Sequence, residues 1–194
     1  SYKLTLQEAL KEIKVLEGNA DKKTVYSHEK FVEPMLKYIV EDFERSRISM
    51  NENSIGGMVV CDSADQAKKM YEIFQTTYAN ETGELGITKN KESYSAKKAN
   101  DRKIKRAAVI LYDVGTKEER KNWVEEFKDG KIDMLFVYNM LLTGFDSPRL
   151  KKLYVGRVIK AHNLLQTLTS VNRTYKDFRY GYVVDFAGIE AQFK

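Results

Sequence analysis

The sequence has little that would cross-link it, bind zinc through paired thiols or hold it in a membrane. It contains one cysteine and two prolines in 194 residues, which excludes an internal disulfide framework and a zinc site built on a CxxC pair. Its longest purely apolar run, Ala107 to Tyr112, is far shorter than the roughly 20 residues of a membrane span. No secretory signal is recognisable, so we expect a reducing cytoplasm, no membrane partner and a buried Cys61. Because residue 1 is serine, we expect a piece of a longer protein.

The formal charge of +5 is unevenly distributed. The 33 Lys and Arg residues face 28 Asp and Glu residues over the whole chain. Between Thr88 and Arg106, however, eight basic residues oppose two acids, a local charge of +6 that leaves −1 for the rest. The protein is therefore predicted to be a nearly neutral globule that carries one basic surface insertion, at about residues 80–106.

Five short apolar runs, rich in β-branched and aromatic residues, read as strands buried on both faces of a sheet. They are residues 58–61, 107–112, 134–138, 153–155 and 182–186. Helical patterns lie between them, and strands that alternate with helices predict an α/β fold with a mainly parallel sheet.

Three helices are predicted within this α/β region. Ser63 with Gln66 and Thr116 with Glu119 have the spacing of a capping box, which marks a helix start. A third helix is expected over residues 163–175, with Leu164, Leu165, Leu168 and Val171 facing inward.

Residues 1–54 form a predicted helical lead-in that packs on the main domain of residues 55–194. One helix starts near Thr5 and turns Leu6, Leu10, Ile13 and Leu16 inward. Pro34 is expected in the first turn of a second helix, which carries Met35, Leu36, Ile39, Val40 and Phe43 on its apolar face.

Functional residues are expected just after each strand, because ligands of open parallel sheets collect at the carboxyl ends of the strands. Ser63 follows the first run and suggests a phosphate contact, although, taken alone, it is better explained as an ordinary helix cap. Thr143, Gly144 and Asp146 follow the third run and offer a hydroxyl, close backbone approach and a carboxylate, although Gly and Asp are also common turn residues.

The helix after the fourth run carries the remaining candidates. Gln166 and Arg173 are seven residues apart, which places both on nearly one helical face, where the alternative is a solvated polar surface. An arginine there suits charge stabilisation in phosphoryl transfer. Two predictions are open for the basic residues after the third run: they either contact phosphates or form a solvated rim. These residues are Arg149, Lys151 and Lys152.

Together these segments resemble the second RecA-like motor domain of superfamily-two helicases, and more narrowly the R (restriction) subunit of type I restriction-modification enzymes. Residues 57–61 resemble helicase motif IV, residues 142–148 motif V and residues 165–173 motif VI. The ending Val171-Asn172-Arg173 favours the restriction subunit, and the resemblance covers about residues 55–193.

The resemblance implies a RecA-like three-layer sandwich. It also implies a parent subunit that hydrolyses ATP to translocate double-stranded DNA and then cuts it. Ser63 and Thr143 would touch the DNA backbone. Asp146, with Gly144, would lie near the ATP ribose or the domain interface, while Gln166 and Arg173 would face ATP with Mg²⁺, Arg173 as an arginine finger. The implied partners are the first motor domain and nuclease domain of the parent chain, and the modification and specificity subunits.

Two features qualify this expectation. Motif VI of the family usually carries two arginines three residues apart, and here Ser170 stands at the first position. The chain also has no G-x-x-x-x-G-K-[ST] phosphate loop, so we expect no ATP hydrolysis or DNA cleavage by this chain alone. The alternatives are the C-terminal half of another superfamily-two helicase and a catalytically silent RecA-like docking module. The basic insertion is either a non-specific DNA contact or, as we favour, a solvated charged segment.

Overall fold

The computed structural model describes residues 2–18, 21–79, 102–157, 159 and 161–186, with the backbone alone for residues 17 and 161–165. Its elements are α1 (Tyr2–Glu17), α2 (Lys22–Ser27), α3 (Glu29–Ser49), β1 (Gly56–Val60), α4 (Ala64–Ile73), the π-helical turn η1 (Phe74–Tyr78), β2 (Ala107–Ile110), α7 (Lys117–Lys128), β3 (Met134–Val137), β4 (Leu150–Val155), α8 (Ala161–Val171) and β5 (Tyr182–Asp185).

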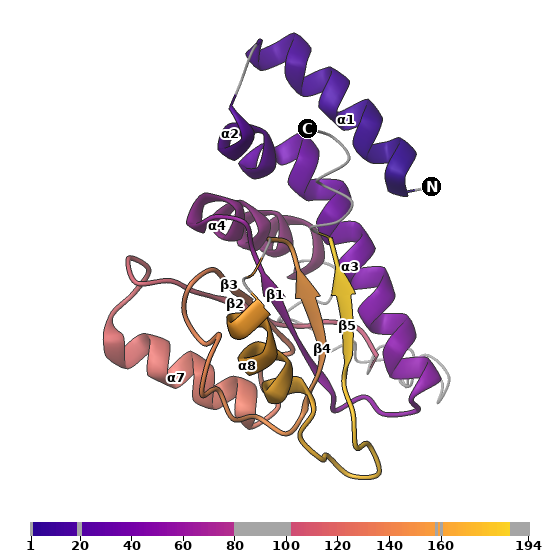
Figure 1. Ribbon diagram of the computed structural model, residues 1–194, viewed down its shortest axis with the longest axis vertical. Helices are drawn as coiled ribbons and strands as arrows, with labels where there is room; N and C mark the ends of the chain where they lie inside the picture. Colours follow the sequence, from indigo (N-terminus) through magenta and orange to yellow (C-terminus); the bar gives the residue numbers. More distant parts are fainter. Residues whose placement is uncertain (1, 19–20, 80–101, 158, 160, 187–194) are drawn as a thin grey trace, which may run out of the picture.

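The strands form one sheet in the order β2-β3-β1-β4-β5, and every described pairing is parallel. Helices α3 and α4 lie on one face of this sheet and α7 and α8 on the other (Figure 1). Alternate residues of each strand point to opposite faces, so Val59 joins the cluster under α3 and α4, whereas Met58 and Val60 join the one under α7 and α8. The predicted three-layer α/β sandwich is therefore confirmed.

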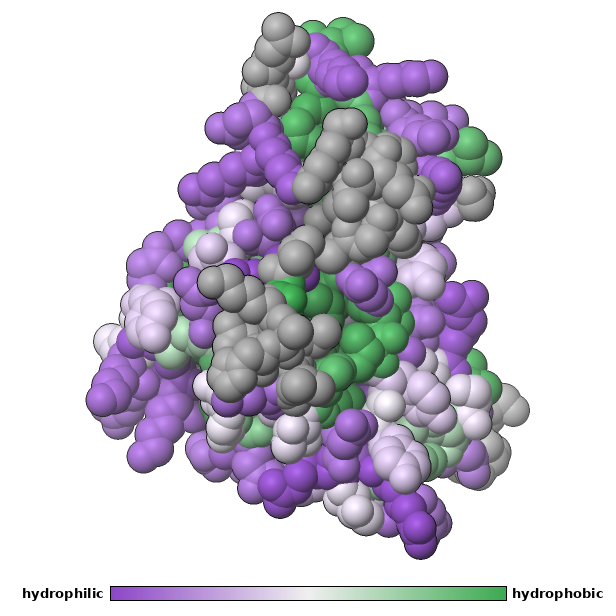
Figure 2. All heavy atoms as spheres, viewed as in Figure 1, coloured by the Kyte–Doolittle hydropathy of each residue, from purple (hydrophilic) through white to green (hydrophobic). Residues whose placement is uncertain are grey.

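The strand at one edge of the sheet differs from its prediction. The run that forms β5 was expected to be buried on both faces, but Tyr182 is 57% and Val183 42% exposed. In the described part of the chain β5 pairs with β4 alone, so its second edge carries no strand. Figure 2 shows apolar residues gathered over β4 and β5 on the face seen there.

The predicted helix starts are confirmed by their caps. The hydroxyl of Ser63 accepts a hydrogen bond from the amide of Gln66, and Thr116 and Glu119 cap α7 reciprocally. Helix α8 is shorter than predicted, because it ends at Val171 rather than near residue 175. Val171 is buried and Leu168 partly buried, as expected, while the side chains of Leu164 and Leu165 lie outside the described part.

Of the N-terminal helices, α3 packs on the sheet through its predicted apolar face, whereas α1 packs on α3 and α2 packs on α3 and α4. Leu6, Ile13 and the apolar face of α3 are buried, but Leu16 is 63% exposed. Pro34 lies in the second turn of α3 rather than its first, because α3 begins at Glu29, where His28 caps it by accepting from the amide of Lys30. The aromatic rings of Tyr2 and Phe186 meet edge to face at 5.8 Å, so α1 reaches the end of β5.

Candidate functional site

The loop between β3 and β4 and helix α8 are joined at the candidate site. Thr167 of α8 is buried and donates its hydroxyl to the carbonyl of Leu142 at 3.0 Å. Phe145, in the same loop, is buried against Phe127 of α7, with ring centroids 6.0 Å apart. The two segments that resemble motifs V and VI therefore form one packed unit on the α7–α8 face.

The tip of this loop faces solvent. Thr143 and Gly144 are exposed, and Gly144 has φ +69° with no heavy atom within 4 Å of where a Cβ would lie. Glycine adopts this left-handed conformation without steric cost. The loop thus presents a hydroxyl and a stretch of bare backbone, as the sequence predicts.

Asp146 and Arg173 form an ion pair at the end of this unit. Their side chains are 3.3 Å apart and about half exposed, at 57% and 52%. Arg173 comes two residues after the last residue of α8. The prediction that it shares a helical face with Gln166 is therefore wrong, although Gln166 does lie exposed on α8.

The position of this pair within the sheet also differs from expectation. Lys151 is the second residue of β4, and its ammonium donates to the carbonyls of Val171 and Arg173. Arg173 therefore lies at the amino end of β4, not at the carboxyl end. The reason is that α8 runs back along the sheet after β4, while the β3–β4 loop passes directly to the start of β4 without a helix (Figure 1).

Ser63 lies at the opposite end of the sheet, just after β1. It is 6% exposed, and its hydroxyl accepts from the amide of Gln66 at 3.0 Å. The Gln66 side chain in turn accepts from the amide of Asp62 and donates to the carbonyl of Tyr26 in α2. Among the contacts of the described residues, none connects Ser63 with Thr143, Asp146 or Arg173, so the six candidates do not form one site.

Arg157 is a residue at the carboxyl end of β4 that the sequence analysis missed. Its guanidinium donates to the side chain of Asn139 at 2.9 Å and to the carbonyl of Tyr138, and it lies 4.7 Å from the Tyr138 ring centre. Burial raises the pKa of the nearby Asp62 carboxyl, while the charges of Lys22 and Arg157 act in the opposite direction. Its place two residues after a strand is the signal that could have identified it.

Neither prediction for Arg149, Lys151 and Lys152 is correct, because all three are buried. Arg149 donates to the carbonyls of Ser54, Phe127 and Ile132 at 2.8 to 2.9 Å, and burial lowers its pKa. Lys152 pairs with Asp42 of α3 at 2.9 Å on the other face of the sheet. These cations are internal and are unavailable to a ligand.

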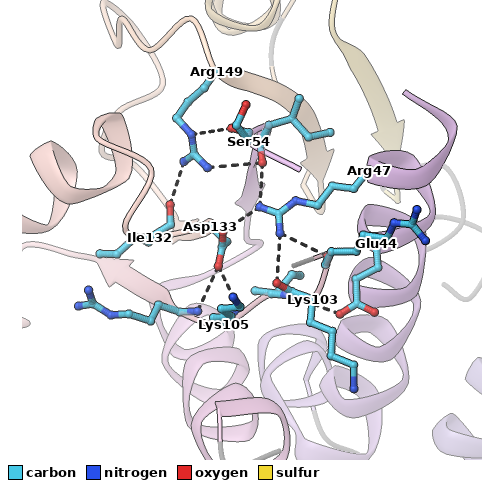
Figure 3. Close-up of polar contacts among 12 residues, drawn as sticks. Glu44, Arg47, Ser54, Lys103, Lys105, Ile132, Asp133 and Arg149 are labelled. Atoms are coloured by element: carbon cyan, nitrogen blue, oxygen red, sulfur yellow. Dashed lines mark hydrogen bonds and ion pairs between the residues drawn. The ribbon is translucent and has the colours of Figure 1, made fainter. Parts of the chain in front are cut away.

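Arg149 belongs to a buried network with Arg47 and Asp133 (Figure 3). Arg47 is 1% exposed and pairs with the carboxylate of Asp133 at 2.8 Å. The second oxygen of Asp133 accepts from the amides of Lys105 and Arg106. The network ties α3 to the last residues of the predicted basic insertion, among them Lys105 and Arg106. Residues 80–101, the greater part of that insertion, lie outside the described residues.

Within the described ranges, no group of three or more His, Cys, Asp or Glu side chains could hold a metal ion. No helix of the described part is long and apolar enough to cross a bilayer.

A family model described as "Type I restriction enzyme subunit R domain 3" matches residues 53–188. The chain belongs to this family. The endonuclease subunit assigned to the type I restriction enzyme MjaVIIP of Methanocaldococcus jannaschii is 28% identical over 184 residues, which is 86% of this chain and 16% of that protein. The SauCOLORF180P endonuclease subunit of Staphylococcus aureus is 40% identical over 73 residues, 37% of this chain and 8% of that protein. The chain thus spans a small part of these relatives.

Solved structures support the fold. A fragment assigned to an HsdR subunit of a type I restriction enzyme from Vibrio vulnificus matches with a TM-score of 0.59 and 14% identity, over 92% of this chain and 31% of that one. The Pyrococcus furiosus Hef helicase domain matches with a TM-score of 0.51 and 13% identity, over 98% and 37%. Domain 2 of the DEAD-box helicase Mss116p matches with a TM-score of 0.50 and 11% identity, over 82% and 50%. This R-subunit domain therefore has the RecA-like fold of a second helicase domain.

Proposed function

We propose that this R-subunit domain is the second motor lobe of a type I restriction enzyme, which moves double-stranded DNA at the expense of ATP before the DNA is cut. The observation that carries the proposal is the packed unit of the β3–β4 loop and α8, which presents Asp146 and Arg173 together on the surface. In a chain of this family, that unit corresponds to the motifs that complete an ATP site between two motor domains.

The exposed groups of this unit suit that role chemically. A guanidinium such as that of Arg173 can donate two parallel hydrogen bonds to a phosphate, and Gln166 offers a neutral amide. The Asp146 carboxylate would repel a phosphate but accepts from hydroxyl groups such as those of a ribose, beside the open backbone of Gly144. ATP with Mg²⁺, held mainly by the first motor domain, supplies the hydrolysis that drives movement.

On the DNA side, the proposed contact is the exposed hydroxyl of Thr143. Ser63 is buried and caps α4, so its contribution to DNA binding would be through the position of the α4 amino terminus rather than through a free hydroxyl. The first motor domain, the nuclease domain and the modification and specificity subunits are the proposed partners.

The test is Arg173→Ala in the R subunit that carries this domain. Loss of an arginine finger is expected to lower DNA-stimulated ATP hydrolysis by about 10³-fold or more, measured as phosphate release at saturating ATP. Arg179→Ala removes another exposed arginine six residues further on and should leave turnover within about twofold. A loss of less than tenfold on changing Arg173 would contradict the assignment.

One observation favours a second candidate, a catalytically silent docking module. Ser170 stands where the family usually has the first motif VI arginine, and it is 8% exposed, so it offers a ligand neither a charge nor an open surface. This candidate predicts that the unaltered R subunit lacks DNA-stimulated ATP hydrolysis altogether. Ser170→Arg would then be expected to raise turnover from that baseline.

A further inference from the structure

Lys151 is a buried cation with an unusual set of partners. Its side chain is 0% exposed, and its ammonium donates to the carbonyls of Val171 and Arg173. In the described part of the chain, no acidic side chain pairs with it. Burial lowers its pKa, which reflects the cost of holding a charge in the interior.

The two carbonyls that Lys151 binds come from the end of α8 and the residue that carries the candidate arginine finger. The last carbonyls of a helix have no partner within it and bear partial negative charge, so a cation is favourable there. Here the cation comes from the neighbouring strand β4 rather than from the helix itself. It therefore fixes the Arg173 backbone relative to the central sheet.

The chain after α8, residues 172–181, which we call the Arg173 loop, is held on its other side as well. Tyr175 and Phe178 exchange backbone hydrogen bonds of 2.9 Å. The Tyr175 hydroxyl lies 2.5 Å from that of Ser54, and Lys176 pairs with Glu52 at 2.8 Å. The loop is thus fastened to the segment before β1 and, through Lys151, to the start of β4.

The loop also closes tightly on the helix. A Cβ on Gly181 would lie 1.9 Å from the Val171 side chain, so glycine is required for β5 to start so close to the end of α8. Contacts on three sides therefore hold the Arg173 loop, and among them the one from Lys151 bonds the Arg173 backbone itself, while its guanidinium remains half exposed. The position of the guanidinium then depends on its own side-chain rotations and on its ion pair with Asp146.

We propose that Lys151 is a positioning residue for Arg173: its ammonium holds the Arg173 backbone so that the guanidinium meets the nucleotide at the correct distance. The inference rests on the proposed function. A misplacement of about 1 Å in a catalytic group can cost about 10²-fold in rate, so loss of this contact is expected to act on turnover rather than on ATP affinity.

The experiment is a double-mutant cycle in the R subunit that carries this domain. Lys151→Met keeps an unbranched side chain but removes the ammonium. It is expected to lower kcat for DNA-stimulated ATP hydrolysis by about 10- to 100-fold, with KM for ATP changed less than about threefold. In an Arg173→Ala background the same change should have little further effect, because the group it positions is absent.

Lys152→Met is the matched control. Lys152 is the next residue of β4, is equally a buried lysine at 6% exposure, and binds Asp42 on the opposite face of the sheet. It should lower the free energy of unfolding but leave kcat within about twofold. If Lys151→Met and Lys152→Met reduce kcat alike, or if the Lys151 effect persists undiminished in the Arg173→Ala background, Lys151 has a general structural role and the proposal is overturned.

Different results would contradict the positioning role of Lys151 and the proposed function on which it rests. A small effect of Arg173→Ala itself overturns both, whereas a large effect of Arg173→Ala with unchanged kcat in Lys151→Met overturns the positioning role alone. If Lys151→Met does not fold, Tyr175→Phe is measured in its place. This variant removes one hydroxyl that holds the Arg173 loop from its other side. It should lower kcat about threefold or more in the unaltered background and not in the Arg173→Ala background, and equal effects in both would overturn the proposal.

Discussion

Arg47, Arg149 and Lys151 carry their charges into the interior and bond there largely to main-chain carbonyls. Each of them joins segments that are distant in sequence. Arg149, for example, joins the segments before β1 and β3 with the end of α7. A carbonyl that loses such a donor cannot turn to water, so these side chains should matter for stability far more than surface arginines do.

Arg149→Met is therefore predicted to lower the free energy of unfolding by about 3 kcal/mol, since it leaves buried carbonyls without a donor. Arg120 is the matched control, because it also donates to three carbonyls, those of Tyr112, Val114 and Gly115, but at the half-exposed start of α7. Arg120→Met should cost less than about 1 kcal/mol. Urea unfolding of the two variants measures the difference, and equal losses would contradict the role assigned to burial.

The sequence could not distinguish these internal cations from surface ones. Arg149, Lys151 and Lys152 follow a polar loop, which is the local pattern of a solvated rim. Their burial depends on acceptors that lie far away in sequence, such as Phe127 for Arg149 and Asp42 for Lys152. Because Lys151 and Lys152 are buried within it, β4 begins at Leu150, three residues before the apolar run that predicted this strand.

Among the elements, the helices and strands could be predicted where a local pattern decides them. The caps at Ser63 and Thr116 depend on residues three positions apart and were predictable. The end of α8 was not, because the polar residues after Val171 continue a plausible helical pattern while their contacts lie in the segment before β1. Likewise, periodicity predicts an apolar face of α1 but not how much of that face α3 covers.

Helix α1 allows this limit to be tested with two leucines of the same predicted face. Leu6 is 0% and Leu16 is 63% exposed. Leu6→Ala should lower the free energy of unfolding by about 3 kcal/mol, as for other buried leucines, whereas Leu16→Ala should change it by less than about 0.5 kcal/mol. The measurement is urea unfolding followed by circular dichroism. A comparable loss for both variants would mean that α1 is covered along its whole length.

In the molecule as a whole, the sheet separates the candidate groups into two regions. Asp146 and Arg173 lie near the amino end of β4, whereas Ser63 and Arg157 lie near the carboxyl ends of β1 and β4. The sequence placed all candidates at carboxyl ends because each follows a strand. It could not foresee that the β3–β4 connection runs the length of the sheet without a helix.

By itself, this domain is expected to be inactive toward ATP. In the proposed function its groups stabilise charge and position a nucleotide, but the chain has no phosphate loop, and its described part offers no cluster of metal ligands. The isolated 194-residue chain is therefore expected to release no phosphate from ATP with Mg²⁺ above the buffer rate, with or without double-stranded DNA. The R subunit that carries the domain should show DNA-stimulated hydrolysis in the same assay. If the isolated chain hydrolyses ATP and Arg173→Ala abolishes that activity, the prediction is contradicted, because a complete ATP site would then lie within this lobe.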